Sequence, residues 1–294
     1  MPDSPSELTY AEAAYSAGLA TGGRVRFSVS GYRTDAPTDI QNGWVGGRSR
    51  MASLSVSHPL IRSRTDMLSV SAGLEVRRVE QRYVAAGQAD ETMTVARVTL
   101  SGQKRSQSGY VTASLQASQG IDAFGATTQA SDTNTRSDAT GRFTKINARF
   151  SGYRDVGKYA GLFVEAAGQW SADPLLGAEE FFVGGPAFGR AYDYGEISGD
   201  KGVAIALEAR VGVDPPGETV SFVQAYAFVD AAKVWNKTPG PDWSRDLTSA
   251  GVGTRVTVKR ETTLRLEFAK PLSDRPFNEP DNGWRTFVSL SKQF

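Results

Sequence analysis

Apolar residues recur at every second position in segment after segment of this chain. In 203–213 (VAIALEARVGV), the apolar side chains at odd positions fall on one face, whereas Glu208 and Arg210 fall on the other. The same alternation runs through three further segments, 66–77, 109–118 and 262–269. Successive side chains of a β-strand point to opposite faces, whereas a helix repeats every ~3.6 residues. The pattern therefore predicts an all-β protein whose strands each have one apolar and one polar face.

The chain of 294 residues contains about thirteen segments of this kind. We expect strands near 8–17, 24–33, 48–58, 66–79, 91–103, 107–118, 142–153, 159–170, 203–213, 220–234, 248–258, 262–270 and 284–294. The connections alternate in length: short ones lie near 18–23, 59–65, 104–106, 154–158, 214–219 and 259–261, and long ones near 34–47, 80–90, 119–141, 171–202, 235–247 and 271–283. Short turns at one end and long loops at the other are typical of an antiparallel transmembrane β-barrel of the outer membrane.

A soluble β-sandwich is the alternative, because its strands also alternate. Two features favour the barrel. The polar face carries charged residues in one strand after another, namely Arg149, Glu165, Arg265 and Glu267. A water-filled lumen accepts such groups, and a sandwich has no reason to alternate strictly between short and long connections.

The composition excludes several classes of protein. Lys and Arg number 33 and Asp and Glu 32, so no broad excess of basic charge indicates a nucleic-acid partner. Cysteine is absent, which removes disulfides, thiolate metal sites and cysteine nucleophiles. No apolar run approaches the ~18 residues of a membrane helix. A mean hydropathy of −0.34 resembles that of a soluble protein, but a barrel averages an apolar and a polar face.

The residues also argue against an enzyme. The single histidine, His58, lies beside a short turn, far from the outer rim where an outer-membrane hydrolase needs its histidine. Gly251 and Gly253 lie in a strand and lack the third glycine of a dinucleotide loop. Acidic residues in the 119–141 segment (Asp122, Asp132, Asp138) could bind calcium weakly, but we expect them to keep an exposed loop solvated. We therefore predict no catalytic residue, no metal site and no cofactor.

The connection 171–202 has an unusual composition. It contains seven glycines (Gly177, Gly184, Gly185, Gly189, Gly195, Gly199 and Gly202), which permit left-handed backbone and close approach. Five aromatic residues (Phe181, Phe182, Phe188, Tyr192 and Tyr194) lie within 181–194. Aromatic side chains at this density imply burial, so we expect the loop to fold back into the barrel. The 119–141 segment, rich in Ser, Thr, Ala and Asp, is by contrast typical of a flexible loop.

The stretch 181–202 (FFVGGPAFGRAYDYGEISGDKG) resembles the characteristic loop of the outer-membrane protein-assembly and secretion superfamily. It is most similar to the two-partner secretion transporters, also called hemolysin activation/secretion proteins. Their motif Val/Ile-Arg-Gly-Phe/Tyr corresponds to 189–192, where Arg190 and Tyr192 match and the flanking positions depart. The loop residues assigned by this resemblance are Gly184, Gly185, Gly189, Arg190, Tyr192, Gly199, Asp200 and Gly202.

Other stretches extend the resemblance over essentially the whole chain. The family motif Phe-x-Asp-x-Gly appears as Phe228-Val229-Asp230-Ala231-Ala232, with alanine in place of the last glycine. The stretch 57–64 (SHPLIRSR) is similar to a periplasmic hairpin of the family, and Glu208 follows the loop as expected. The resemblance implies that the loop enters the lumen and that Arg190 contacts Asp230. The pair would position the loop without doing chemistry; alternatively, both residues merely line a hydrophilic lumen.

The carboxy-terminal segment 284–294 resembles the last strand of bacterial outer-membrane barrels, which the barrel-assembly machinery reads. Four residues share a face: Trp284, Val288, Leu290 and Phe294. Lys292 occupies a position that is usually apolar. The alternative is an ordinary last strand that happens to end in phenylalanine.

The resemblance implies an outer-membrane transporter, in contact with lipid, that secretes and activates a partner exoprotein such as a hemolysin or adhesin. An insertase of the same superfamily and a passive porin are the alternatives. A family barrel would have about sixteen strands, so we expect residues 1–294 to form one β-barrel domain that is truncated at its amino terminus, with an open or strained seam. The periplasmic polypeptide-transport-associated domains and the signal peptide would then be missing, since MPDSPSELTY has neither a basic start nor an apolar core.

Overall fold

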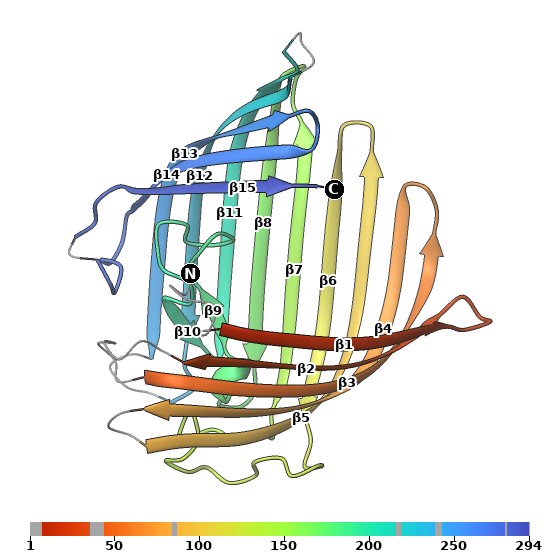
Figure 1. Ribbon diagram of the computed structural model, residues 1–294, viewed down its shortest axis with the longest axis vertical. Coiled ribbons are helices and arrows are strands. Elements are labelled where there is room, and N and C mark those ends of the chain that lie inside the picture. Colours follow the sequence, from red (N-terminus) through yellow and green to blue (C-terminus); the bar gives the residue numbers. More distant parts are fainter. Residues whose placement is uncertain are drawn as a thin grey trace. The chain divides into compact units, whose positions relative to one another are not determined.

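The computed structural model describes residues 8–35, 44–83, 87–215, 219–238, 243–279 and 281–293. Thirteen of its strands form one sheet in chain order (Figure 1). They are β1 (Leu8–Gly18), β2 (Arg24–Asp35), β3 (Trp44–Arg62), β4 (Asp66–Tyr83), β5 (Gly87–Ser106), β6 (Gly109–Gly120), β7 (Thr144–Asp155), β8 (Ala160–Ser171), β11 (Lys201–Val213), β12 (Val220–Trp235), β13 (Ser244–Val258), β14 (Thr262–Pro271) and β15 (Arg285–Lys292). The thirteen strands lie within a few residues of the segments expected from the alternation.

The connection between β8 and β11 holds three short elements: the 3-10 helix η1 (Gly177–Glu179) and the strands β9 (Phe181–Val183) and β10 (Ile197–Gly199). The two strands pair with each other in a separate small sheet. No helix among the described residues is long and apolar enough to cross a membrane.

Some strands are longer than their apolar pattern indicates. The sequence pattern predicts a long connection over 80–90, but β4 continues to Tyr83 and β5 begins at Gly87. In this extension Arg48 lies opposite Glu80 in the β3–β4 register. Backbone hydrogen bonds and cross-strand charge pairs maintain a strand where both faces are polar, and apolar alternation does not reveal such a stretch.

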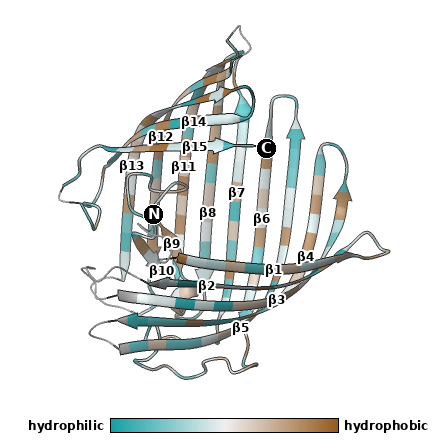
Figure 2. Ribbon diagram, viewed as in Figure 1, coloured by the Kyte–Doolittle hydropathy of each residue, from teal (hydrophilic) through white to brown (hydrophobic). Residues whose placement is uncertain are grey.

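Hydrophilic and hydrophobic residues alternate along many of the strands (Figure 2), and the two faces of a strand differ in exposure as well. Leu207 lies opposite Val164 on β8 and Val229 on β12 and is 44% exposed. The next residue, Glu208, lies opposite Phe163 and Phe228 and is 5% exposed. Along β11 the apolar face is therefore exposed and the polar face is buried, which is the reverse of a soluble sandwich and is typical of a strand that faces lipid.

The chain divides into two compact units, each with its own core. The first unit comprises 1–102, 114–147 and 170–180, and its core consists of Val79, Met93, Val95, Ala139, Phe143, Leu175 and Leu176. The second unit comprises 103–113, 148–169 and 181–294. In its core, aromatic and aliphatic residues of the 181–200 loop pack against the polar face of the sheet: Phe181, Val183, Phe188, Tyr192 and Ile197 meet Tyr226, Phe228, Val234 and Leu247.

The 119–141 segment, which we expect to be an exposed loop, is largely exposed but also contains buried residues and internal hydrogen bonds. Ala139 is buried, and the Asn134 amide donates to the carbonyls of Gln129 and Ala139, at 3.0 Å each. The Thr127 N–H donates to the Thr92 carbonyl at 2.8 Å. Short polar side chains satisfy the backbone groups of tight turns, so a segment rich in such residues can have one defined conformation.

The acidic residues expected to keep that segment solvated include two that form ion pairs. Asp122 pairs with Arg142, and Asp138 pairs with Arg136 at 2.9 Å. Among the described residues, no cluster of three or more His, Cys, Asp or Glu side chains is placed to hold a metal ion.

The last strand has the expected faces. Val288 and Leu290 lie opposite Leu266 and Leu264 of β14 on the exposed apolar face. Trp284 is also exposed and directly precedes β15. Phe294, the fourth residue assigned to the carboxy-terminal signal, lies outside the described residues.

Candidate functional site: the 181–200 loop and its ionic anchor

The 181–200 loop begins and ends in the β9–β10 hairpin, and glycines shape the segment between the two strands. Gly184 has φ +117°, and a Cβ at this position would lie 2.2 Å from the Asp193 carbonyl oxygen. At Gly189, with φ +76°, a Cβ would lie 2.5 Å from Leu247 Cδ1. Gly185 is also left-handed, and its N–H donates to the Gly189 carbonyl at 3.2 Å. Only glycine permits both this backbone and this closeness of approach.

Asp200 and its neighbouring glycines hold the point where the loop enters β11. The Asp200 carboxylate accepts the Lys237 N–H at 2.7 Å, and its carbonyl accepts the Gln169 amide at 3.1 Å. A Cβ on Gly202 would lie 2.1 Å from the Phe181 ring, and one on Gly199 2.9 Å from the Trp235 carbonyl oxygen. These motif residues thus fix the exit of the loop structurally.

Arg190 lies at the centre of the second unit, and its side chain is 3% exposed. Its backbone N–H and its guanidinium donate to the two oxygens of Asp230, at 3.0 and 3.2 Å. A second guanidinium nitrogen donates to Glu208 at 2.6 Å. The guanidinium also stacks on the Phe228 ring, with Cζ 4.0 Å from the ring centroid. The structure therefore contains the Arg190–Asp230 contact that the resemblance implies, and adds Glu208 as a closer partner.

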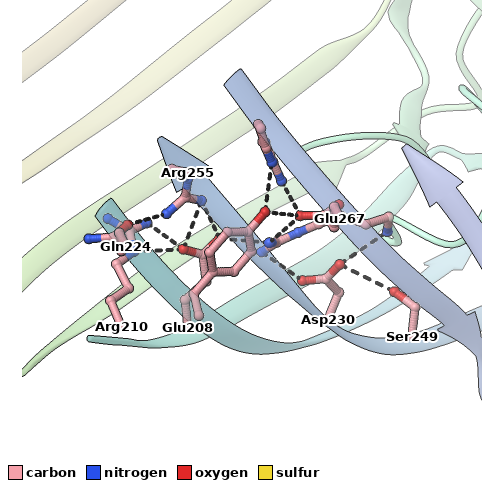
Figure 3. A network of polar contacts seen from close by, with 10 residues as sticks. Glu208, Arg210, Gln224, Asp230, Ser249, Arg255 and Glu267 are labelled. Carbon is pink, nitrogen blue, oxygen red and sulfur yellow. Dashed lines mark hydrogen bonds and ion pairs between the residues drawn. The ribbon is translucent and has the colours of Figure 1, made fainter. Parts of the chain in front are cut away.

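This arginine belongs to a larger polar network on the polar face of β11 to β14 (Figure 3). Glu208 also accepts from Arg210 at 2.6 Å and from Arg255 at 3.2 Å. Glu267 pairs with Arg265, accepts the Tyr226 hydroxyl at 2.7 Å and lies 3.5 Å from Arg190. Ser249 donates to Asp230 at 3.2 Å. Four guanidinium groups thus compensate three buried carboxylates, so none of these acids is left as an isolated charge.

The sequence reasoning found only part of this network. It placed Arg265 and Glu267 on the polar face but did not connect them with Arg190, and it assigned no role to Arg255. The same alternation contains the missing signal, because Tyr226, Arg255 and Glu267 all share a face with Asp230. The register shows why they meet: Tyr226 lies opposite Gly253, which in turn lies opposite Glu267.

A second set of contacts attaches the loop to β13, to the start of β15 and to the segment between β14 and β15. Asp193 accepts Arg285 at 2.6 Å and the Asn278 amide at 3.1 Å. Burial by itself would raise the pKa of Asp193, but the hydrogen bonds from Arg285 and Asn278 and the Arg285 charge outweigh it, so the pKa is lowered. The Tyr192 hydroxyl donates to the Thr248 carbonyl at 3.1 Å and lies 2.9 Å from the Ser273 hydroxyl. Tyr192 is therefore a tether of the loop as well as a core residue.

The first unit has an ionic site of its own, which the sequence reasoning missed. Glu179 of η1 accepts Arg97 at 2.6 Å and pairs with Lys145 at 2.7 Å, and its carboxylate is 2% exposed. Burial would raise its pKa, but the two cations outweigh that effect and lower it. The Lys145 amine also donates to the Glu179 carbonyl at 2.8 Å. Residues 173–180 are therefore anchored through Glu179, whose carboxylate binds Arg97 of β5 and Lys145 of β7.

The sequence and the fold are similar to those of known proteins. The family model described as haemolysin secretion/activation protein ShlB/FhaC/HecB matches residues 22–256. The structure of CdiB from Escherichia coli is similar, with a TM-score of 0.74 and 21% identity over 96% of this chain and 53% of that one. CdiB from Acinetobacter baumannii has a TM-score of 0.70 and 19% identity over 97% and 51% of the two chains.

The crystal structure of BamA from Haemophilus ducreyi lacking POTRA domains 1–3 has a TM-score of 0.67 and 14% identity over 97% of this chain and 62% of that one. A search of curated protein sequences returns no match. The chain thus spans about half the length of the CdiB structures. These structures are outer-membrane β-barrels, and at these identities they establish the fold.

Proposed function

Because the chain belongs to the haemolysin secretion/activation protein family ShlB/FhaC/HecB, we propose that it is the membrane part of a transporter that exports and activates a partner exoprotein, such as a hemolysin or adhesin. The family and the fold place it among the outer-membrane β-barrels. The exoprotein would pass in an unfolded state along the polar face of the sheet, without nucleotide hydrolysis. Periplasmic domains would receive it, by adding its extended segments to an exposed strand edge.

The observation that carries this proposal is the anchoring of the 181–200 loop by Arg190. The loop rests on the polar face through Asp230 and Glu208, where the exoprotein would pass. Most donors and acceptors of the network bond one another, although Arg190 Nε is buried without a hydrogen-bond partner among the described residues. The network has the composition of a structural anchor. Its role in our proposal is therefore to hold the loop in the transport-competent position.

Secretion by variants of the complete gene tests this role. We expect Arg190→Ala and Asp230→Ala each to reduce the exoprotein in the medium by at least tenfold. Arg190→Ala leaves the buried Asp230 without its cation, and Asp230→Ala removes the bonds that the Arg190 N–H and guanidinium make to β12. Arg190→Lys keeps the charge but loses the planar guanidinium that contacts Asp230 and Glu208 at the same time, so we expect a partial defect. Arg149→Ala is the matched control, since Arg149 is an exposed arginine on the polar face of β7.

Surface amounts and heat-modifiable mobility of each variant must be measured beside secretion, to separate transport from assembly. Wild-type secretion by both Arg190→Ala and Asp230→Ala, at wild-type surface amounts, would contradict the proposed role.

The insertase and porin alternatives predict different phenotypes. Deletion of an insertase would lower the amounts of other outer-membrane barrels. Deletion of a secretion transporter would remove only its exoprotein from the medium. A porin would give a large, steady conductance in a planar bilayer that does not change when the 181–200 loop is altered. We expect a deletion strain to keep its other barrels and to lose one secreted protein.

A further inference from the structure

A groove of about 640 Å³ lies on the apolar face of the second unit, across β6, β7, β8, β11 and β12. Its walls are large apolar side chains, including Phe150, Leu162 and Leu207, which are 39–53% exposed. The inward-facing Glu208 and Phe228 also border it, since each lies between two outward-facing residues of its strand. The volume lies within the ~300–1,000 Å³ range of small-molecule sites.

Small residues create the depression. Ala209 lies opposite Ala227 on β12 and Leu162 on β8, so two short side chains adjoin within a row that is otherwise bulky. Gly152 also lines the groove; a Cβ there would lie 3.5 Å from Cζ of Phe150, which places that ring beside the glycine. The face that meets the bilayer therefore has a hollow in place of a convex surface.

Arg154 gives the groove one charged end. It lines the groove, is exposed, and its guanidinium makes no hydrogen bond or ion pair with any residue that the structure describes. It lies next to the last residue of β7. The even residues of β7 include Ile146, Phe150 and Arg154, so the arginine is on the apolar face, where no carboxylate of the described residues pairs with it.

The height of Arg154 in the membrane follows from the turns around it. The Asp155 N–H donates to the Ser108 carbonyl, and the Gly212 N–H donates to the Tyr159 carbonyl, at 2.8 Å each. The β7–β8 turn therefore lies beside the β5–β6 turn and the end of β11 (Figure 1), and short turns of outer-membrane barrels face the periplasm. Tyr159 is half-exposed with the Lys158 amine 5.0 Å from its ring centroid, as is typical of the interfacial aromatic belt.

We propose that this groove binds an anionic phospholipid of the periplasmic leaflet, with an acyl chain in the hollow and the phosphate on Arg154. The Cα atoms of residues 150 and 154 are separated by roughly 13 Å of strand rise, about half of the ~25 Å apolar band of such barrels. The groove thus has the depth of one leaflet. A guanidinium binds a phosphate through two parallel hydrogen bonds, and an anionic headgroup carries no ammonium that would oppose this contact.

Native mass spectrometry of the full-length protein in detergent, titrated with phosphatidylglycerol, tests the site. We expect Arg154→Gln to weaken retention of phosphatidylglycerol about fivefold, the factor expected for one basic residue at a membrane surface. Ala227→Phe should weaken it as well, by filling the hollow. Two matched controls should retain lipid like the wild type: Arg149→Gln, on the other face of β7, and Ala225→Phe, on the same face of β12 but outside the groove.

The alternatives give distinct results. Equal retention of phosphatidylglycerol and phosphatidylcholine by the wild type would overturn the headgroup assignment. Displacement of the lipid by inorganic phosphate alone would show a simple anion site and would also overturn the proposal. Equal retention by Arg154→Gln and Arg149→Gln, with both proteins folded by circular dichroism, would show that Arg154 takes no part.

Discussion

At the scale of single residues, the core of the second unit depends on how Arg190 is surrounded. Its guanidinium contacts Asp230, Glu208 and the Phe228 ring, and two other arginines, Arg210 and Arg255, share Glu208. A lone buried charge would cost several kcal/mol, so the cluster is stable only because every carboxylate has a cation beside it. Loss of Arg190 is the most costly single change, since it leaves the buried Asp230 without a cation, whereas Glu208 keeps Arg210 and Arg255.

The Asp193–Arg285 contact gives a pH dependence with a defined sign. The pKa of Asp193 is lowered in the folded protein, so its ionised form contributes stability above the unfolded value of ~3.9, and this contribution disappears as the pH falls through the folded pKa. We expect Asp193→Asn to be less stable than the wild type at pH 7, and the difference in melting temperature to shrink below pH ~4. A difference that is constant from pH 3 to 7 would contradict the assignment.

Among single residues, the sequence could predict Arg190 and Asp230 but not Arg255 or Glu267 as members of one site. Arg190 and Asp230 lie in recognisable short motifs. The other two are ordinary residues of alternating strands, and their proximity to Arg190 depends on the inter-strand register and on the path of the loop. Neither the register nor the path of the loop can be read from a few neighbouring positions in the sequence.

At the scale of elements, the 181–200 loop is a folded element with its own hairpin, glycine turns and aromatic core. Its β9–β10 pairing joins Val183 to Ile197, both of which are buried. The aromatic content predicted this burial, because exposed aromatic side chains at such density would be costly in water. The prediction is confirmed for Phe181, Phe188 and Tyr192 but is wrong for Phe182 and Tyr194, which are 51% and 90% exposed. The 119–141 segment has no such content, so its ordered conformation was missed; its structure depends on hydrogen bonds of short polar side chains.

Two glycine substitutions test the turn geometry of the loop. We expect Gly184→Ala to destabilise the loop by ~1–3 kcal/mol from backbone strain alone, with an added clash against the Asp193 carbonyl. Gly195→Ala is the matched control: its φ is +72°, and the nearest atom to a Cβ lies 3.8 Å away, so we expect only ~1–2 kcal/mol. Limited proteolysis of the loop measures both; equal cleavage rates would show that the close approach at Gly184 is unimportant.

At the scale of the whole molecule, the distribution of polarity across the sheet decides its environment. Apolar residues such as Leu207 and Val229 are exposed, while Glu208 and Asp230 on the adjacent positions are buried. Water would be a poor solvent for the exposed face, and lipid is a good one. This arrangement, with the family and the fold, accounts for a membrane protein whose average composition resembles that of a soluble one.

A change of charge should therefore affect stability much more on the apolar face than on the polar face. Leu207 is the middle residue of β11, so we expect Leu207→Arg to lower the free energy of unfolding from bilayers by ~2–4 kcal/mol. Arg149→Leu, which removes a charge from the polar face, should change it by no more than ~0.5 kcal/mol. Urea unfolding in phosphatidylcholine vesicles compares the two. A small effect of Leu207→Arg would mean that this face does not meet lipid.

The sequence by itself determined the strands, their two faces and the loop motif, because strand alternation and turn chemistry are local and leave a direct periodic trace. It also determined the family through short motifs around Arg190 and Asp230. Only the tertiary structure decided which charges meet: Glu208, Arg255 and Glu267 around Arg190 in one unit, and Arg97 and Lys145 around Glu179 in the other. The physical reason is that an ion pair depends on distances between elements far apart in the chain, and these are set by register and packing.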